Sequence, residues 1–105
     1  MNDDTSLQMR IGRTPLVRSH RLEAALRVPE IHFKLEGNNP SGHREDRMAY
    51  LAIRDALARG KPTITMGTLG TTAGSLSYLA PYFGVRCVLY LPSRKRALRS
   101  RLLVG

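Results

Sequence analysis

The feature that most constrains the fold is a regular alternation of strand-like and helix-like segments. Residues 31–35 alternate apolar and polar side chains, and residues 63–66 and 85–91 are short apolar or β-branched runs, which are strand patterns. Helical spacing follows at residues 44–59 and 72–79. This order predicts a three-layer α/β fold, in which helices flank a parallel sheet with right-handed crossovers.

Composition also predicts which parts of these segments are buried. The nearly continuous apolar run at residues 85–91 is typical of a strand covered on both faces. Within the helix at 44–59, the inward stripe is predicted from helical spacing. Its members are Met48, Leu51, Ala52, Ala56 and Leu57.

Turn-forming and polar residues divide the chain. Pro29 ends a short helix predicted at residues 20–26, and a basic helix is predicted from Pro92 to the end of the chain. Residues 1–11 are polar and predict a loosely ordered lead-in. Residues 12–105 are therefore predicted to form one α/β domain.

The charge balance is strongly basic. The chain has 17 Lys and Arg against 8 Asp and Glu, a net charge of +9, but only residues 94–101 form a dense basic cluster. Aromatic residues, which stack on bases, make up only 6% of the chain. Nucleic acid is therefore not the expected partner, although a basic nucleic-acid binder is kept as an alternative function.

Other function classes are disfavoured by single residue types. Apolar runs are too short to span a membrane, and one cysteine, Cys87, makes no internal disulfide, so we expect a cytoplasmic protein. The residues His20, His32 and His43 have no metal-ligand spacing with one another or with Cys87, and no metal site is predicted.

A loop rich in glycine and threonine follows the strand at 63–66. In an open α/β sheet, ligands bind beyond the carboxyl ends of the strands, beside helix N-termini. The backbone N–H groups and hydroxyls of this loop suit a carboxylate or phosphate, although an ordinary strand-to-helix turn explains the same residues. The candidate anion-binding residues are Thr68, Gly70, Thr71 and Thr72.

Three motifs in order resemble the fold-type II pyridoxal-phosphate enzymes, the threonine synthase, cysteine synthase and tryptophan synthase beta-like family. Residues 12–17 (GRTPLV) are similar to the G-x-T-P-L opening of that family. Residues 34–49 resemble K-x-E-x-x-N-P-[ST]-G-S-x-K-D-R-x-A, which surrounds the cofactor-binding lysine, and residues 68–75 resemble the substrate loop S-x-G-N-T-x-x-S. The resemblance covers about residues 12–104 and implies the N-terminal part of such an enzyme.

The resemblance implies pyridoxal 5'-phosphate as cofactor and a small amino acid as ligand. In the family, the lysine forms an imine with the cofactor, which acts as an electron sink for eliminations on amino acids. The substrate loop holds the substrate carboxylate, and its Asn bonds the cofactor.

Two positions depart from the family pattern. Glu45 occupies the expected lysine position and has no amine, and Thr71 stands at the expected Asn position. A carboxylate about 4 Å from an anionic cofactor costs about 4 kcal/mol at an effective dielectric of about 20. We therefore expect no catalytic residue, no covalent cofactor binding and only weak cofactor contact through Thr71.

These features predict an inactive, truncated relative of the amino-acid lyases and synthases, because the family's phosphate loop would lie beyond Gly105. A regulatory pseudoenzyme that pairs with a full-length paralogue, or forms a homodimer, is the alternative. A further alternative is that the chain is encoded by the first piece of a split gene.

Overall fold

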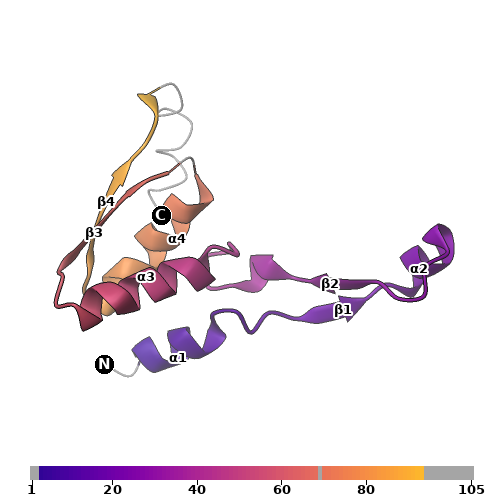
Figure 1. Cartoon of the computed structure of the whole chain (residues 1–105). Coiled ribbons are helices and arrows are strands. Elements are labelled where there is room, and N and C mark those ends of the chain that lie inside the picture. The colour runs from indigo at the N-terminus through magenta and orange to yellow at the C-terminus, as the bar shows by residue number, and fades with distance from the viewer. Residues whose placement is uncertain (1–2, 69, 94–105) are drawn as a thin grey trace.

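The computed structural model describes residues 3–68 and 70–93. Figure 1 shows a body built from α3, α4 and the strands β3 and β4, from which an arm formed by β1, α2 and β2 projects. In chain order the elements are α1 (Asp3–Arg10), β1 (Leu16–Arg18), α2 (His20–Leu26), β2 (His32–Lys34), η1 (Glu36–Asn38), α3 (Asp46–Ala58), β3 (Thr63–Gly67), α4 (Thr71–Leu79), η2 (Ala80–Phe83) and β4 (Arg86–Tyr90). The α/β class predicted from the alternating pattern is confirmed.

The strands form two separate sheets. β3 and β4 pair in parallel, with Ile64 opposite Cys87, as the crossover through α4 requires. β1 and β2 instead pair antiparallel, with Val17 opposite Phe33. The prediction of one parallel sheet is therefore confirmed for β3 and β4, and it is wrong for the strand predicted at residues 31–35, which pairs antiparallel with β1.

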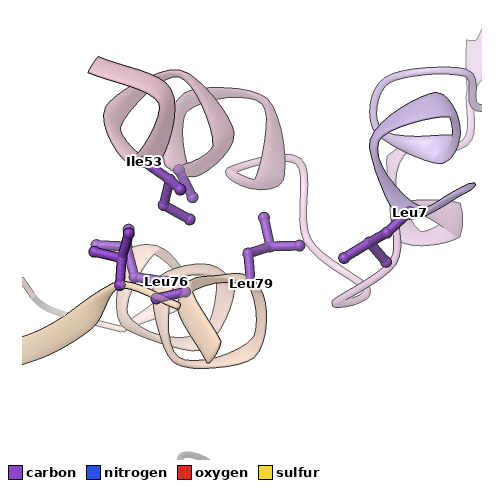
Figure 2. Close-up of a cluster of buried hydrophobic side chains, with 7 residues drawn as sticks. Leu7, Ile53, Leu76 and Leu79 are labelled. Atoms are coloured by element: carbon purple, nitrogen blue, oxygen red, sulfur yellow. The ribbon is translucent and has the colours of Figure 1, made fainter. Parts of the chain in front are cut away.

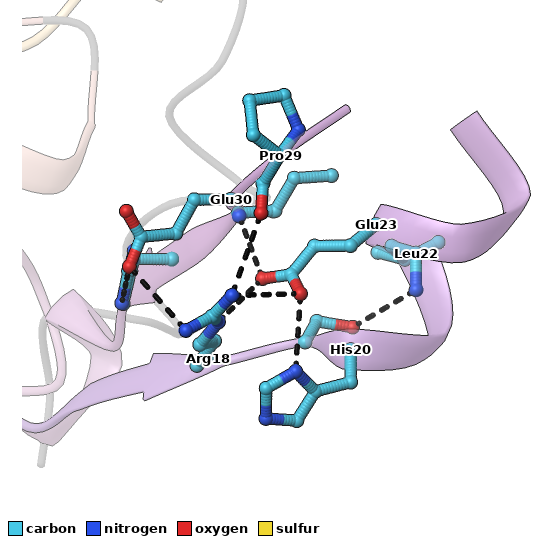
Figure 3. A network of polar contacts seen from close by, with 9 residues as sticks. Arg18, His20, Leu22, Glu23, Pro29 and Glu30 are labelled. Carbon is cyan, nitrogen blue, oxygen red and sulfur yellow. Dashed lines mark hydrogen bonds and ion pairs between the residues drawn. The ribbon is translucent and has the colours of Figure 1, made fainter. Parts of the chain in front are cut away.

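The antiparallel pairing follows from the way α2 closes the connection between β1 and β2 (Figure 3). The Glu23 carboxylate on α2 accepts hydrogen bonds from Arg18 Nε at 2.8 Å and from the Ile31 backbone N–H at 2.9 Å. Glu23 thus ties the end of one strand to the start of the next. The chain must reverse direction there.

Local signals explain the limits of α2. The Ser19 hydroxyl accepts a hydrogen bond from the Leu22 N–H and caps the helix start. Arg27 adopts a left-handed conformation at the helix end, with φ of 53°. The bounds predicted for this helix, residues 20–26, are confirmed.

The core lies where α3, α4 and α1 meet (Figure 2). Ile53, Leu76 and Leu79 are fully buried, and each contributes about 1.5–3 kcal/mol through the apolar surface removed from water. Leu7 also joins the core, so residues 3–10 form a helix rather than the loosely ordered lead-in expected from their polarity. Leu7 and the neighbouring Ile11 pack this short polar helix against the body.

One burial prediction is wrong in part and a second is wrong. α3 buries Ala49, Ile53 and Ala56, of which only Ala56 belongs to the predicted stripe, and Leu51 on that stripe is 67% exposed. β4 alternates exposed and half-buried residues rather than being buried throughout. Both errors have one cause, because the described residues cover only one face of α3 and one face of the two-stranded sheet.

One predicted helix falls almost wholly outside the described residues. It is the basic helix expected after Pro92, which contains the arginine cluster and occupies residues 94–105. Between residues 3 and 93, apart from position 69, the helices are too short or too polar to cross a bilayer.

Candidate functional site

The residues of the first two motifs form one hydrogen-bond network. Arg47 donates to both Glu36 oxygens, at 3.0 and 2.8 Å, and to the Gly12 carbonyl at 2.9 Å. The Thr14 hydroxyl donates to Glu36 at 2.8 Å, and Gly12 N–H donates to the side chain of Asn39 at 2.8 Å. The network fixes the chain opening against the start of α3.

Glu36 is the centre of this network, and its ionisation reflects that position. Hydrogen bonds from Arg47, then from Thr14, lower the pKa of Glu36 from its ordinary value of 4.5 to about 2, against the opposing effect of burial. The carboxylate is therefore charged at neutral pH. Its hydrogen bonds with Thr14 and Arg47 join the chain opening to α3.

The loop before α3 packs against the first turn of α4. Asp46 is fully buried and accepts hydrogen bonds from both the backbone N–H of Ser41, at 2.8 Å, and the Ser41 hydroxyl. The Ser41 hydroxyl also lies 3.2 Å from the hydroxyl of the buried Ser75. The N-termini of α3 and α4 are thereby held together.

Glycine at position 74 allows this close approach. A Cβ atom at Gly74 would lie 3.1 Å from the ring Nε2 of His43, which is tighter than ordinary van der Waals contact. The lysine-motif loop and the substrate-motif loop thus pack on each other. Two independent contacts, Ser41 with Ser75 and His43 with Gly74, hold the two loops together.

Glu45, at the expected lysine position, meets Thr71, at the expected Asn position. Burial acts to raise the pKa of Glu45, but hydrogen bonds from its own backbone N–H, from the Thr71 hydroxyl and from Arg44 together lower it. Arg44 Nε lies 3.3 Å from the carboxylate. Glu45 is therefore an ionised carboxylate held by two neighbours, and it has no nitrogen with which an aldehyde could condense.

A shallow hollow adjoins Glu45. Its lining combines three cations and two carboxylates, of which Glu36 is already paired with Arg47. The ammonium group of Lys34, the one lysine in the hollow, donates to the Thr14 carbonyl. The hollow is lined by Lys34, Glu36, Arg44, Glu45, Arg47 and Met48.

The predicted anion loop lies at the carboxyl ends of β3 and β4, as expected for an α/β sheet. Thr68 and Thr72 line a second hollow there, together with Gly67, Tyr90, Leu91 and Pro92. Gly70 precedes α4, whose first turn has no side-chain cap, and the Gly70 N–H donates to the Thr68 hydroxyl at 3.2 Å. Thr71 points instead to Glu45.

Several residues that hold the site were not singled out from the sequence. Ser41, Asp46 and Ser75 form the contact between the two loops, and Asn39 joins the opening network. All four lie within the family-like motifs, so the motifs themselves were the available signal. Over the described residues no group of three His, Cys, Asp or Glu could hold a metal ion, and Cys87 is a half-buried free thiol.

Comparison with protein families gives a match over residues 7–104 to the pyridoxal-phosphate dependent enzyme family. The threonine synthase of Mycobacterium leprae (strain TN) is 35% identical over 97 residues, covering 92% of this chain and 27% of that protein. Cysteine synthase B of Salmonella typhimurium is 38% identical over 104 residues, covering 90% of this chain and 34% of that enzyme. The chain thus spans about a third of the length of these relatives.

Solved structures agree with this assignment. The chain superimposes on O-ureido-L-serine synthase with a TM-score of 0.77 and 33% identity, covering 92% of this chain and 31% of that one. The O-acetylserine dependent cystathionine beta-synthase of Helicobacter pylori gives a TM-score of 0.71 at 25% identity. The chain belongs to the fold-type II pyridoxal-phosphate-dependent enzymes, and it corresponds to the N-terminal part of its relatives.

Proposed function

We propose that this chain is a family member without lyase activity of its own, which holds no covalently bound cofactor and keeps an anion-binding loop. The observation that carries the proposal is Glu45 itself, a carboxylate beside Arg44 at the position of the family's lysine. An ionised carboxylate in place of the lysine amine removes the covalent link, and it repels an anionic cofactor. The residues at this position therefore do not fit pyridoxal 5'-phosphate.

The retained binding capacity is assigned to the hollow at the ends of β3 and β4. The uncapped first turn of α4 and the hydroxyl of Thr72 offer donors to an anionic group. A small amino-acid carboxylate or a free phosphate suits these donors. We place the protein in the reducing cytoplasm, in keeping with its single free Cys87.

The covalent part of the proposal is tested with the cofactor itself. The protein is mixed with one equivalent of pyridoxal 5'-phosphate, reduced with borohydride and mapped by mass spectrometry. We expect no stoichiometric adduct at any single position, because Glu45 has no amine and Lys34 is bonded to the Thr14 carbonyl. A full equivalent of cofactor on one lysine would refute this part.

The binding part is tested separately, by NMR titration with inorganic phosphate and with L-serine. We expect amide shifts confined to Gly67, Thr68, Gly70 and Thr72, and weaker binding by Thr72→Val. Glu45→Gln, which removes a nearby negative charge, is expected to tighten phosphate binding. Shifts scattered over the surface, or equal binding by all three proteins, would contradict an anion site in this loop.

A further inference from the structure

A third hollow lies between α1, α3 and η2. Its volume is about 380 Å³, and it shares no lining residue with the hollows beside Glu45 and at the strand ends. Most of its lining comes from one face of α3, at the spacing i, i+4, i+7 and i+8, and the neighbouring elements add one residue each. The lining residues are Gln8, Tyr50, Arg54, Leu57, Ala58 and Phe83.

The apolar part of this hollow is anchored to the core. The rings of Tyr50 and Phe83 lie 5.7 Å apart between centroids, at an interplanar angle of 49°, and both residues pack against the buried cluster. Side chains that pack on a core have little freedom to rearrange. Leu57, which is 48% exposed, adds further uncovered apolar surface. The hollow therefore offers a preformed apolar wall.

Arg54 is the one charged residue of the lining, and it has no counter-ion among the side chains described within residues 6–68 and 70–93. Its guanidinium Cζ lies 5.9 Å from the centroid of the Tyr50 ring. That contact supplies no oxygen acceptor for the guanidinium N–H groups. Arg59, farther along the same helix, is in contrast paired with Asp55 at 2.9 Å. The hollow thus carries an uncompensated positive charge.

These features together define the chemistry of a matching ligand. A guanidinium binds a carboxylate through two parallel N–H bonds, and aromatic walls bind a ring by burying its apolar surface. The Gln8 amide adds a donor and an acceptor. Protein pockets for small molecules have volumes from about 300 Å³ upward, so this hollow has room for a molecule with one ring rather than for a larger cofactor.

We propose that the hollow between α1, α3 and η2 binds a small aromatic carboxylate. The carboxylate of the ligand pairs with Arg54, and its ring packs against Tyr50, Phe83 and Leu57. This inference goes beyond the proposed anion loop and does not depend on it, because neither Glu45 nor the residues of that loop line this hollow. It gives the chain a separate, noncovalent ligand site.

The proposal is tested by NMR titration of the chain with 3-phenylpropionate. Two related probes separate the contributions of charge and ring, since 3-phenylpropionamide lacks the charge and propionate lacks the ring. We expect 3-phenylpropionate to shift the amide signals of the lining residues, and each related probe to bind at least about tenfold more weakly. The proposal is overturned if the amide binds as tightly as the acid, or if millimolar acid leaves those signals unchanged.

Matched variants on α3 distinguish a specific ion pair from general attraction to a basic protein. Arg54→Gln is expected to weaken 3-phenylpropionate binding about tenfold and to leave 3-phenylpropionamide binding unchanged. Arg59→Gln removes the same charge from a residue outside the hollow and is expected to change neither. Both positions are exposed, and circular dichroism establishes that the helices are kept. Equal losses in the two variants would show that the net charge of +9 alone attracts the acid, which contradicts the proposal.

The same spectra separate this site from the anion loop. Leu57→Ala is expected to weaken the acid and the amide alike, by about fivefold, because it removes apolar surface that both ligands contact. Inorganic phosphate has no ring and is expected to leave the signals of the hollow in place. Shifts by 3-phenylpropionate at Thr68 and Thr72 instead of the hollow would assign the acid to the strand ends and refute this inference.

Discussion

Replacement of Gly12 by alanine tests the network that joins the chain opening to α3. Gly12 has a φ of +76°, which costs a residue with a side chain about 1 kcal/mol. A Cβ atom there would lie 2.6 Å from the Nη1 atom of Arg47, so the guanidinium must move. Moving the guanidinium disturbs its hydrogen bonds to the Gly12 carbonyl and to Glu36, which costs about 1 kcal/mol more. We expect Gly12→Ala to lower the free energy of unfolding by about 2 kcal/mol.

Gly60 provides a matched control for the backbone contribution. Its φ is +64°, but an added Cβ atom would meet nothing within 4 Å. Gly60→Ala is therefore expected to cost only the conformational part, about 1 kcal/mol. The difference between the two variants isolates the displacement of Arg47.

Urea denaturation followed by circular dichroism measures both costs, and a double-mutant cycle locates their origin. In an Arg47→Ala background the guanidinium is gone, so Gly12→Ala is expected to cost the same as Gly60→Ala. The reasoning is refuted if the two glycine variants are equally stable in the native background. It is equally refuted if the extra cost of Gly12→Ala persists without Arg47.

Two further predictions concern the core and the arm. Ile53→Ala, at a fully buried position, is expected to lower the free energy of unfolding by about 3 kcal/mol in the same urea experiment. Leu51 lies on the same helix but is 67% exposed, so Leu51→Ala is expected to change that free energy by less than about 0.5 kcal/mol. The pKa of both Glu23 and Glu36 falls from 4.5 to about 2 on folding, so their stabilisation is present above pH 4.5 and is lost as the pH falls from 4.5 to 2. Stability measured across that range should fall less steeply in Glu23→Gln, and an unchanged slope would contradict the assignment.

Local sequence signals predicted α2, α3, β3 and α4 well, because each is encoded within a few residues, whereas α1 was missed. Ser19 caps α2, and the predicted bounds of that helix are those observed. The strand at β3 and the helix at α4 lie within a residue of their predicted limits. The pairing of β1 with β2 was not predictable in this way, since it depends on Glu23 bridging residues on both sides of α2.

In the candidate site, too, the features encoded by neighbouring residues were predicted, and the contacts between distant segments were not. The motif spacing predicted that Thr68 and Thr72 lie at the strand ends, and they line the hollow there. The contact between Glu45 and Thr71 depends on how α3 packs on α4, which a pattern along the chain does not encode. The network around Glu36 was not predicted either, because its hydrogen bonds join the chain opening to residues more than 20 positions away.

The apolar residues that were expected to be buried but are exposed lie on three separate elements. The sequence places apolar residues on the outer face of α3, on both faces of β4 and on one face of the arm, where Leu51, Val88 and Phe33 are exposed. Solitary exposed apolar side chains are ordinary, but three separate elements with uncovered apolar faces are not. Each pattern is correct for a chain that is covered on more sides than residues 3–68 and 70–93 cover themselves. The faces on which the burial predictions failed are therefore surfaces suited to contact with further protein surface.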